Sequence, residues 1–185
     1  MKFLLSFFLF TSVISCGTGG GGGGGDNNSS SGAADASVRT SPNKIDVQDR
    51  TEVRISLKKV NRNGIVVKVK YPKKLEYVAA TSFLKVDGED KDVNPDVTAS
   101  VDSKSYLAFF FPRSFFGDVS DNQDDEEVSN PGELRFELVG RERLTQGAIE
   151  IDVDVDDPTI GNPGEFDPSS PAFQTESEAS IEVED

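Results

Sequence analysis

Four carboxylates crowd one polar segment of this chain. They are Asp121, Asp124, Asp125 and Glu126. Calcium takes six to eight oxygen ligands, and clustered loop carboxylates supply several of them. The EF-hand spacing, with its central glycine, is absent. The segment is therefore a candidate Ca²⁺ site on a long acidic loop, and Ca²⁺ is the one cofactor that the residue types point to.

A second acidic group alternates with apolar residues along a predicted strand. Glu150, Asp152, Asp154 and Asp156 are expected to face outward. Residues two apart on one strand face are about 6.5–7 Å apart, which is wide for three ligands on one ion. The spacing therefore favours a solvated face that resists edge-to-edge aggregation over a second Ca²⁺ site. Paired acids also serve glycoside hydrolases. Because nothing in the sequence gives one acid a raised pKa, that activity is the least favoured alternative.

Composition excludes several kinds of chemistry. The chain has 185 residues, a formal net charge of −14, no histidine, no tryptophan and one cysteine. Without histidine it lacks the usual general base and the commonest metal ligand near neutral pH. Without tryptophan a flat aromatic platform for sugars is disfavoured. The negative charge repels nucleic acid and anionic lipid surfaces. We therefore expect a protein that is not an enzyme and that does not bind nucleic acid.

The single cysteine, Cys16, closes an apolar N-terminal segment. Lys2 precedes an apolar run over residues 3–10, and Val13-Ile14-Ser15-Cys16 follows. A short positive start, a brief apolar core and a small residue before the cut site are typical of a secretory signal. The run is too short to span a bilayer. Val13-Ile14-Ser15-Cys16 resembles the lipobox of bacterial lipoproteins, in which signal peptidase II cuts before a cysteine that carries acyl chains. The alternative is an ordinary secretory signal with an incidental thiol.

The lipobox resemblance implies a signal peptide over residues 1–15 and a lipid anchor on Cys16. One acyl chain holds a protein only marginally, whereas several hold it firmly. Gly17 stands where Gram-negative lipoproteins carry an aspartate for inner-membrane retention, so the resemblance implies the outer membrane, with the domain facing the periplasm or the cell surface. Residues 16–43 then predict a flexible tether, because glycine and serine chains behave as random coils.

Alternation of apolar and polar residues dominates residues 44–160. A period of two predicts half-buried strands, Asn63-Gly64 predicts a hairpin turn, and Pro72 ends a ladder because it lacks an N–H. The continuous apolar run at residues 106–111 predicts a strand covered on both faces at the centre of the core. The predicted strands cover residues 53–57, 65–71, 75–78, 97–101, 106–111, 134–138 and 149–155. This pattern predicts an all-β, antiparallel sandwich.

The tail, residues 161–185, is rich in proline and acidic residues. We expect it to run extended over the surface, with Phe166 and Phe173 as apolar points that pin it to the sandwich. Residues 179–183 alternate weakly. That pattern leaves two alternatives open, an added edge strand and a frayed acidic terminus.

The segment from Val53 to Val155 resembles a cohesin-like module, one branch of the bacterial jelly-roll and immunoglobulin-like sandwiches. The resemblance rests on Tyr71-Pro72-Lys73-Lys74-Leu75-Glu76-Tyr77-Val78, where a strand ends in Tyr and Leu opens the next, and on Gly132-Glu133-Leu134-Arg135-Phe136. Pro72 stands where the family more often has Asp, and the acidic loop is an insertion. Cohesins bind dockerins, but no partner-contacting residue carries over. A generic immunoglobulin-like sandwich fits almost as well.

These features predict a lipid-anchored cell-envelope protein that displays a non-catalytic β-sandwich for binding, adhesion or envelope structure. A calcium- or carbohydrate-binding module of an envelope assembly is the alternative. The expected partners are the membrane, through the lipid anchor, and a protein or a glycan.

Overall fold

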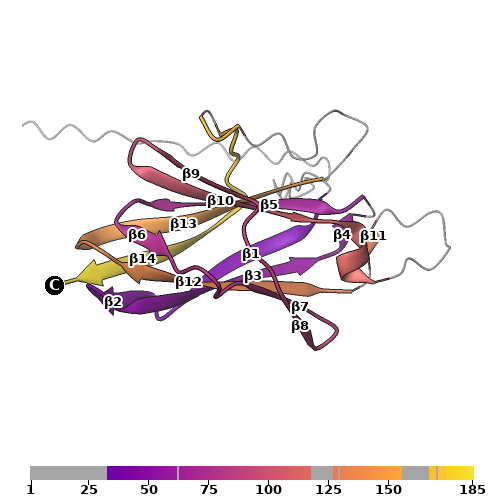
Figure 1. Cartoon of the computed structure of the whole chain (residues 1–185), viewed down its shortest axis with the longest axis horizontal. Coiled ribbons are helices and arrows are strands. Elements are labelled where there is room, and N and C mark those ends of the chain that lie inside the picture. Colours follow the sequence, from indigo (N-terminus) through magenta and orange to yellow (C-terminus); the bar gives the residue numbers. More distant parts are fainter. Residues whose placement is uncertain (1–32, 62, 118–126, 129, 156–166, 170) are drawn as a thin grey trace, which may run out of the picture.

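The computed structural model describes residues 33–61, 63–117, 127–128, 130–155, 167–169 and 171–185, which form a sandwich of two β-sheets (Figure 1). The strands are β1 (Asp35–Ser41), β2 (Lys44–Asp46), β3 (Arg50–Lys58), β4 (Val60–Asn61), β5 (Ile65–Pro72), β6 (Leu75–Tyr77), β7 (Phe83–Val86), β8 (Glu89–Asp92), β9 (Val97–Val101), β10 (Lys104–Phe111), β11 (Glu127–Val128), β12 (Gly132–Gly140), β13 (Leu144–Val155) and β14 (Ser177–Glu184). A 3-10 helix spans Arg113–Phe116. Within the described ranges, no helix has the length and apolar character needed to cross a membrane.

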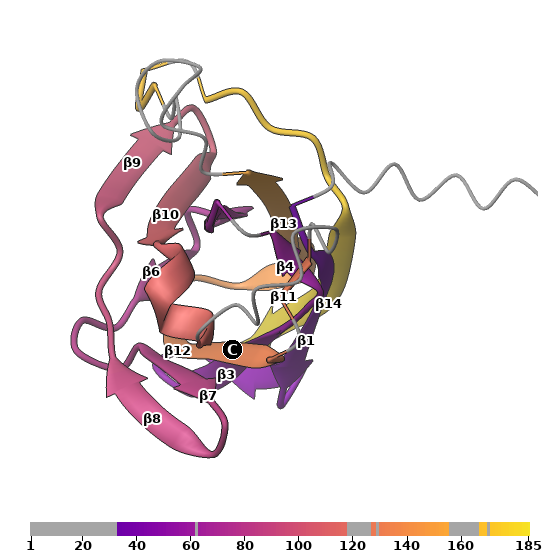
Figure 2. The same ribbon diagram turned by 90° about the vertical axis from the view of Figure 1, so that its right-hand side faces the viewer.

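Twelve of the described strands form two six-stranded sheets, which face each other in the end view of Figure 2, and β4 and β11 pair with each other as a separate two-stranded sheet. The first sheet has the order β1-β3-β12-β7-β8, and β6 also pairs with β12. The second has the order β2-β14-β13-β5-β10-β9. Neighbours pair antiparallel except β14 and β2, which run parallel. The predicted all-β, antiparallel sandwich is confirmed, with this one parallel pair at its edge.

Alternating side chains from both sheets make the core. On β3, Val53, Ile55 and Leu57 are fully buried while the residues between them are half-buried, as a strand with one covered face requires. From the second sheet, the ring of Phe109 stacks on Phe111 and lies 6.0 Å from that of Phe136 on the first. Aromatic side chains carry much of the buried apolar area in such a core.

The apolar run in β10 lies near the centre of the core only on its inward side. Leu107, Phe109 and Phe111 are buried; on the other side Ala108 is buried, and Tyr106 and Phe110 are half-buried. The expectation that both faces are covered therefore holds fully only around Ala108. β10 is next to the sheet edge, and only β9 lies beyond it.

The expected tether boundary at residue 43 is wrong. Residues 35–41 form β1, which pairs with β3 from Asp35 opposite Lys58 to Ser41 opposite Glu52. Ala33, Ala34 and Val38 are buried. The alternation of β1 rests on small residues and one valine, so its sequence looks like linker although its backbone completes a sheet. Residues 1–32, with the predicted signal peptide and Cys16, lie outside the described residues.

The open question about the tail is answered by β14. Ser177–Glu184 pairs with β13 on one side and with β2 on the other, so it is an internal strand, and β2 holds the edge. Its residues Ile181 and Val183 are buried in the core. The folded unit therefore begins before residue 44 and continues past residue 160.

Candidate functional site

Several residues singled out from the sequence lie outside the described part of the chain. They are Cys16, the loop acids Asp121, Asp124, Asp125 and Glu126, and Asp156 and Phe166. The Ca²⁺ and lipidation assignments therefore stay predictions. Among the described residues, no group of three or more acidic, cysteine or histidine side chains is arranged to hold a metal ion.

The outward face of β13 is not a solvated acidic face, and that expectation was wrong. Asp152 is only 3% exposed and lies directly opposite Lys68 of β5, which is 4% exposed. The Lys68 Nζ donates a hydrogen bond to the Asp152 Oδ2 at 3.0 Å and also contacts the Asp154 carboxylate. β13 is internal to its sheet, so Asp152 and Glu150 meet lysines of the next strand instead of water, whereas 43% of the Asp154 side chain stays exposed.

The tail covers this pair. Residues 172–175, here called the strap, lie across the outward faces of β13 and β5. The Gln174 N–H donates to the Asp152 Oδ2 at 3.0 Å, and the Lys68 Nζ lies 3.4 Å from the Ala172 carbonyl oxygen. The Glu176 N–H donates to the Ile151 carbonyl. The strap therefore supplies the polar partners that a buried lysine and carboxylate need.

Phe173 pins the strap to the sheet, as predicted. The Lys70 Nζ lies 4.3 Å from the centroid of its ring, a cation–π contact. The ring of Tyr106 meets it edge-on at 6.2 Å. The apolar point recognised in the sequence thus docks on the charged outward side of the sheet, not in the core.

A second ion cluster continues the first along the sheet. Glu150 accepts hydrogen bonds from the Lys70 Nζ and the Thr175 Oγ1, both at 2.6 Å, and the Lys104 Nζ lies 3.8 Å away. Burial would raise the pKa of Glu150, but the bonds from Lys70 and Thr175 outweigh it and hold the pKa below its ordinary value. Burial likewise opposes the charge on Lys68, yet its hydrogen bonds to Asp154 and Asp152 raise its pKa.

These charges determine what the cluster can do. Each described acid on this face of β13 is paired with a lysine, and the pKa of Glu150 is lowered, not raised. General acid catalysis by such a pair needs one raised pKa. The cluster therefore has the chemistry of a structural ion pair network, which fixes the strap on the sheet.

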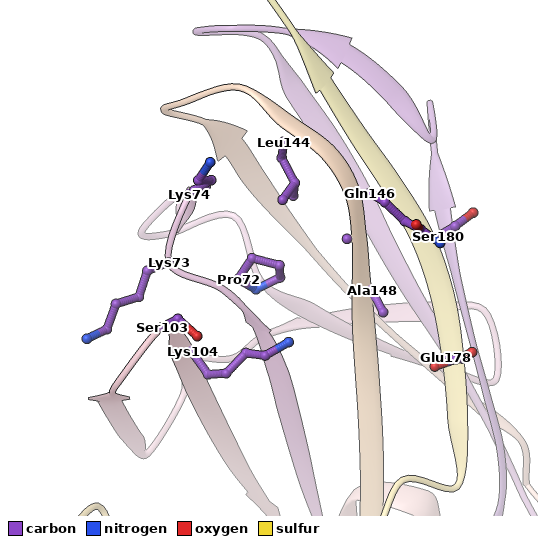
Figure 3. A pocket seen from close by; sticks show the side chains of 11 residues that line it. Pro72, Lys73, Lys74, Ser103, Lys104, Leu144, Gln146, Ala148, Glu178 and Ser180 are labelled. Carbon is purple, nitrogen blue, oxygen red and sulfur yellow. The ribbon is translucent and has the colours of Figure 1, made fainter.

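Beyond Lys104 the same sheet face opens into a groove of about 680 Å³ (Figure 3). In Figure 3, Pro72 and Lys104 lie on one side, Gln146, Ser180 and Glu178 lie on the other, and Lys73 extends away from the groove. The lining residues are Pro72, Lys73, Lys74, Ser103, Lys104, Leu144, Gln146, Gly147, Ala148, Glu178 and Ser180.

A local irregularity in β13 shapes the groove. The pairing of β13 with β14 shifts register between Leu144 and Gly147, which is a β-bulge. A Cβ on Gly147 would come within 2.5 Å of the Leu144 Cδ2 and 3.2 Å of the Pro72 Cγ. Glycine therefore lets the Leu144 side chain lie against the backbone at this point, and a larger residue would push Leu144 into the groove.

The groove combines an apolar floor with a cationic rim. Leu144, Pro72 and Ala148 supply apolar surface, and Lys74 and Lys104 lie at its rim with one acid, Glu178. The Lys74 Nζ donates to the Arg143 carbonyl at 2.8 Å, which holds the Nζ in place beside the groove. In a chain with a formal net charge of −14, this is a local excess of positive charge. Sequence reasoning missed it. The Lys73-Lys74 doublet was the only available signal, since Lys104 joins through the sheet.

Comparisons with known proteins bear on the fold. No protein-family model and no curated protein sequence matches this chain. Solved structures with similar folds include the major pilin SpaA of Corynebacterium diphtheriae, at 14% identity and a TM-score of 0.49, with 80% of this chain covering 37% of SpaA. A non-cellulosomal cohesin of the archaeon Archaeoglobus fulgidus has 10% identity and a TM-score of 0.36, with 81% of this chain covering 91% of the cohesin.

A third similar structure is the collagen-binding domain of the surface protein RspB of Erysipelothrix rhusiopathiae. It has 11% identity and a TM-score of 0.41, with 74% of this chain covering 42% of that one. This chain thus spans little more than a third of the length of the SpaA pilin. The likeness concerns the β-sandwich architecture, which the two facing sheets define directly.

Proposed function

We propose that this chain is a lipid-anchored protein of the bacterial cell envelope, held by Cys16 in the outer membrane, whose β-sandwich is a non-catalytic module for binding or adhesion. The groove on the second sheet carries this proposal. It joins an apolar floor to a cationic rim, a combination that suits a partner with both apolar and anionic groups.

The absence of catalysis is part of the proposal. The described carboxylates on the outward face of β13 are engaged by Lys68, Lys70 and Lys104. Glu150 has a lowered pKa and so lacks the raised pKa of a general acid, and lysines occupy oxygens of Glu150 and Asp152 that an ion would need. What the face offers is shape and charge, and those are the properties of a recognition surface.

In this proposal, the lipid anchor on Cys16 holds the β-sandwich at the membrane through a linker. Sixteen residues separate Cys16 from Ala33, the first residue that the structure describes. A glycine- and serine-rich chain of that length has a root-mean-square span of about 20–25 Å. The tether therefore lets the sandwich reach a partner while the acyl chains stay in the membrane.

The test uses the full-length protein in its own cells. We expect wild type to sediment with the outer membrane and Cys16→Ser to be released, because acylation is lost with the thiol. In the wild-type protein, a photo-cross-linking residue replaces Gln146 in the groove, and a matched probe replaces the exposed Lys58 on β3. Cross-linked products should form from position 146 and not from position 58.

Neutralising the rim should weaken the cross-link. The double variant Lys74→Gln/Lys104→Gln removes two positive charges, and loss of two rim charges is expected to reduce the yield about tenfold at low ionic strength. Lys58→Gln is the matched control and should change nothing. Cys16→Ser that stays with the membrane contradicts the anchor, and equal cross-linking from positions 146 and 58 contradicts the binding role.

A further inference from the structure

Among the described strands, the two six-stranded sheets have five edge strands, β1, β6, β8, β2 and β9, and four of these are protected against pairing with another chain; β6 is only three residues long. An unprotected edge presents unpaired N–H and C=O groups, which natural proteins usually block with charges, brevity or a covering segment. β8 consists only of charged residues, Glu89, Asp90, Lys91 and Asp92. β2 has three residues, and its Lys44 is ion-paired with Glu184 at 2.7 Å.

The edge of β1 is covered by the other sheet. The Val38 N–H donates to the Ser177 Oγ at 3.2 Å, and the Thr40 Oγ1 donates to the Ser180 carbonyl at 3.0 Å. Both acceptors belong to β14, so β1 bridges to the second sheet and closes this side of the sandwich. Its edge is therefore already used within the fold.

Within the described residues, the fifth edge, β9, has none of these devices. Its sequence, Val97–Val101, contains no charge and no proline. Among the described strands it pairs only with β10. The two-residue turn places Val101 opposite Lys104 as the first hydrogen-bonded pair, so Thr98 and Ser100 direct their N–H and C=O groups away from β10. Both residues are exposed.

A second groove, of about 560 Å³, opens beside β9 between the two sheets. Figure 2 shows β9 and β6 along the same side of the sandwich. The rings of Tyr71 and Tyr77 and the side chains of Leu75 and Leu107 supply its apolar lining. Alternate side chains of a strand added to β9 would point into this groove, since successive residues of a strand face opposite sides.

The charges at this groove favour an added strand that carries an acidic side chain. Its lining includes Lys73, Arg141 and Glu76, and Glu76 is paired with the Arg141 Nε at 2.6 Å. Within the part of the chain that the structure describes, no side chain is placed as an ion-pair partner of Lys73. A carboxylate on the incoming strand would therefore find an exposed cation at the groove.

We propose that β9 is a strand-addition site that accepts an extended segment of a partner polypeptide carrying an acidic side chain for Lys73. This proposal deepens the binding function proposed above and rests on it. Main-chain hydrogen bonds to Thr98 and Ser100 would supply affinity. Contacts of alternate side chains with the groove beside β9 would supply specificity, as is usual in strand addition.

The probe is a ten-residue peptide that alternates valine and threonine with one central glutamate. It is titrated into the chain from residue 17 onward, which retains every described strand, and followed by backbone amide NMR. We expect saturable shifts and slowed amide exchange at Thr98 and Ser100, and none along β8.

Ser100→Pro removes an outward N–H and should weaken binding tenfold or more, because a main-chain bond is lost and the ring opposes the incoming strand. Asp90→Pro in β8 is the matched control and should bind like wild type. A peptide with proline at two alternate positions should not bind. Lys73→Gln should weaken the glutamate peptide severalfold and leave a glutamine version unchanged.

Three results overturn the proposal. They are the absence of saturable shifts, shifts that survive Ser100→Pro, and concentration-dependent dimerisation of wild type that Ser100→Pro abolishes. The last result would assign β9 to a second copy of this chain. None of these results contradicts the function proposed above. That function is tested separately, by the membrane release of Cys16→Ser and by cross-linking from position 146.

Discussion

Lys68 decides whether the acidic residues of β13 face solvent or form ion pairs. In the sequence, the residues of β13 from Ile149 onward alternate between apolar and acidic. This pattern is typical of a strand with one buried and one solvent-exposed face. In the fold, the acids at 152 and 154 meet the ammonium group of Lys68. A buried charge is tolerated only with a partner, so the lysine and the two acids must be read together.

The first prediction concerns this pair. Lys68→Met should lower the free energy of unfolding by about 2–4 kcal/mol, because Asp152 stays buried without its counter-charge. The double variant Lys68→Met/Asp152→Leu should recover at least half of the loss, since two apolar side chains tolerate burial together. Urea unfolding of the chain from residue 17 onward measures both.

Lys58→Met serves as the matched control for this cycle, because Lys58 is exposed on β3, and its effect should stay within about 0.5 kcal/mol. Equal losses for Lys68→Met and Lys58→Met, or a double variant less stable than the single one, would contradict a paired buried charge.

At the scale of elements, β1 and β14 pair with the central strands β3 and β13. β1 extends the first sheet, β14 lies inside the second, and two side-chain bonds connect them. The strap precedes β14 and covers the ion clusters. The sandwich is therefore closed by segments that sequence composition alone assigns to a linker and a tail.

The second prediction follows from that closure. A fragment of residues 44–160 lacks both strands and should not fold cooperatively, because β3 and β13 lose a neighbour and the apolar residues Ile181 and Val183 leave the core. A fragment of residues 33–185 should show dispersed amide NMR signals and a single urea transition. Cooperative unfolding of the shorter fragment would show that the closing strands are dispensable.

For the whole molecule, titration of buried groups links pH to stability. Burial raises the pKa of Tyr71 to about 12 from an ordinary value of about 10. A raised folded-state pKa contributes stability that is complete below pH 10 and is lost as pH rises towards 12. The raised pKa of Lys68 acts in the same direction above its ordinary value of 10.5. Glu150 acts in acid, where its lowered pKa makes stability fall as pH falls.

The third prediction concerns the loss of folding stability at alkaline pH. Between pH 9 and pH 11, wild type should lose about 1 kcal/mol more stability than Tyr71→Phe, because the phenol ionises more readily in the unfolded chain. Urea unfolding at both pH values gives the comparison. The pH-independent cost of the substitution cancels in the difference, so equal slopes for the two proteins would contradict a titrating, buried Tyr71.

Much of the fold could be predicted because strand periodicity is local. The alternation in β3 and β12 predicted which residues would be buried, and Pro72 marked the end of β5 as its missing N–H requires. The candidate site was harder to predict. Lys73 and Lys74 are adjacent, but Lys104, Leu144 and Glu178 reach the same groove only through the pairing of β5 with β10 and of β13 with β14.

By itself, the sequence determined the all-β class, the place of the turn before β5, the end of β5 at Pro72 and the alternating faces, because each depends on residues a few positions apart. The hairpin expected at Asn63-Gly64 was wrong, because β4 pairs with β11 and β5 pairs with β10 and β13. Only the tertiary structure decided which alternating face meets water. That choice depends on which strand lies beside which, and hydrogen-bonded neighbours such as β5 and β13 are about 80 residues apart in sequence. Outward acids therefore became buried ion pairs, and a sparse linker and an acidic tail became strands.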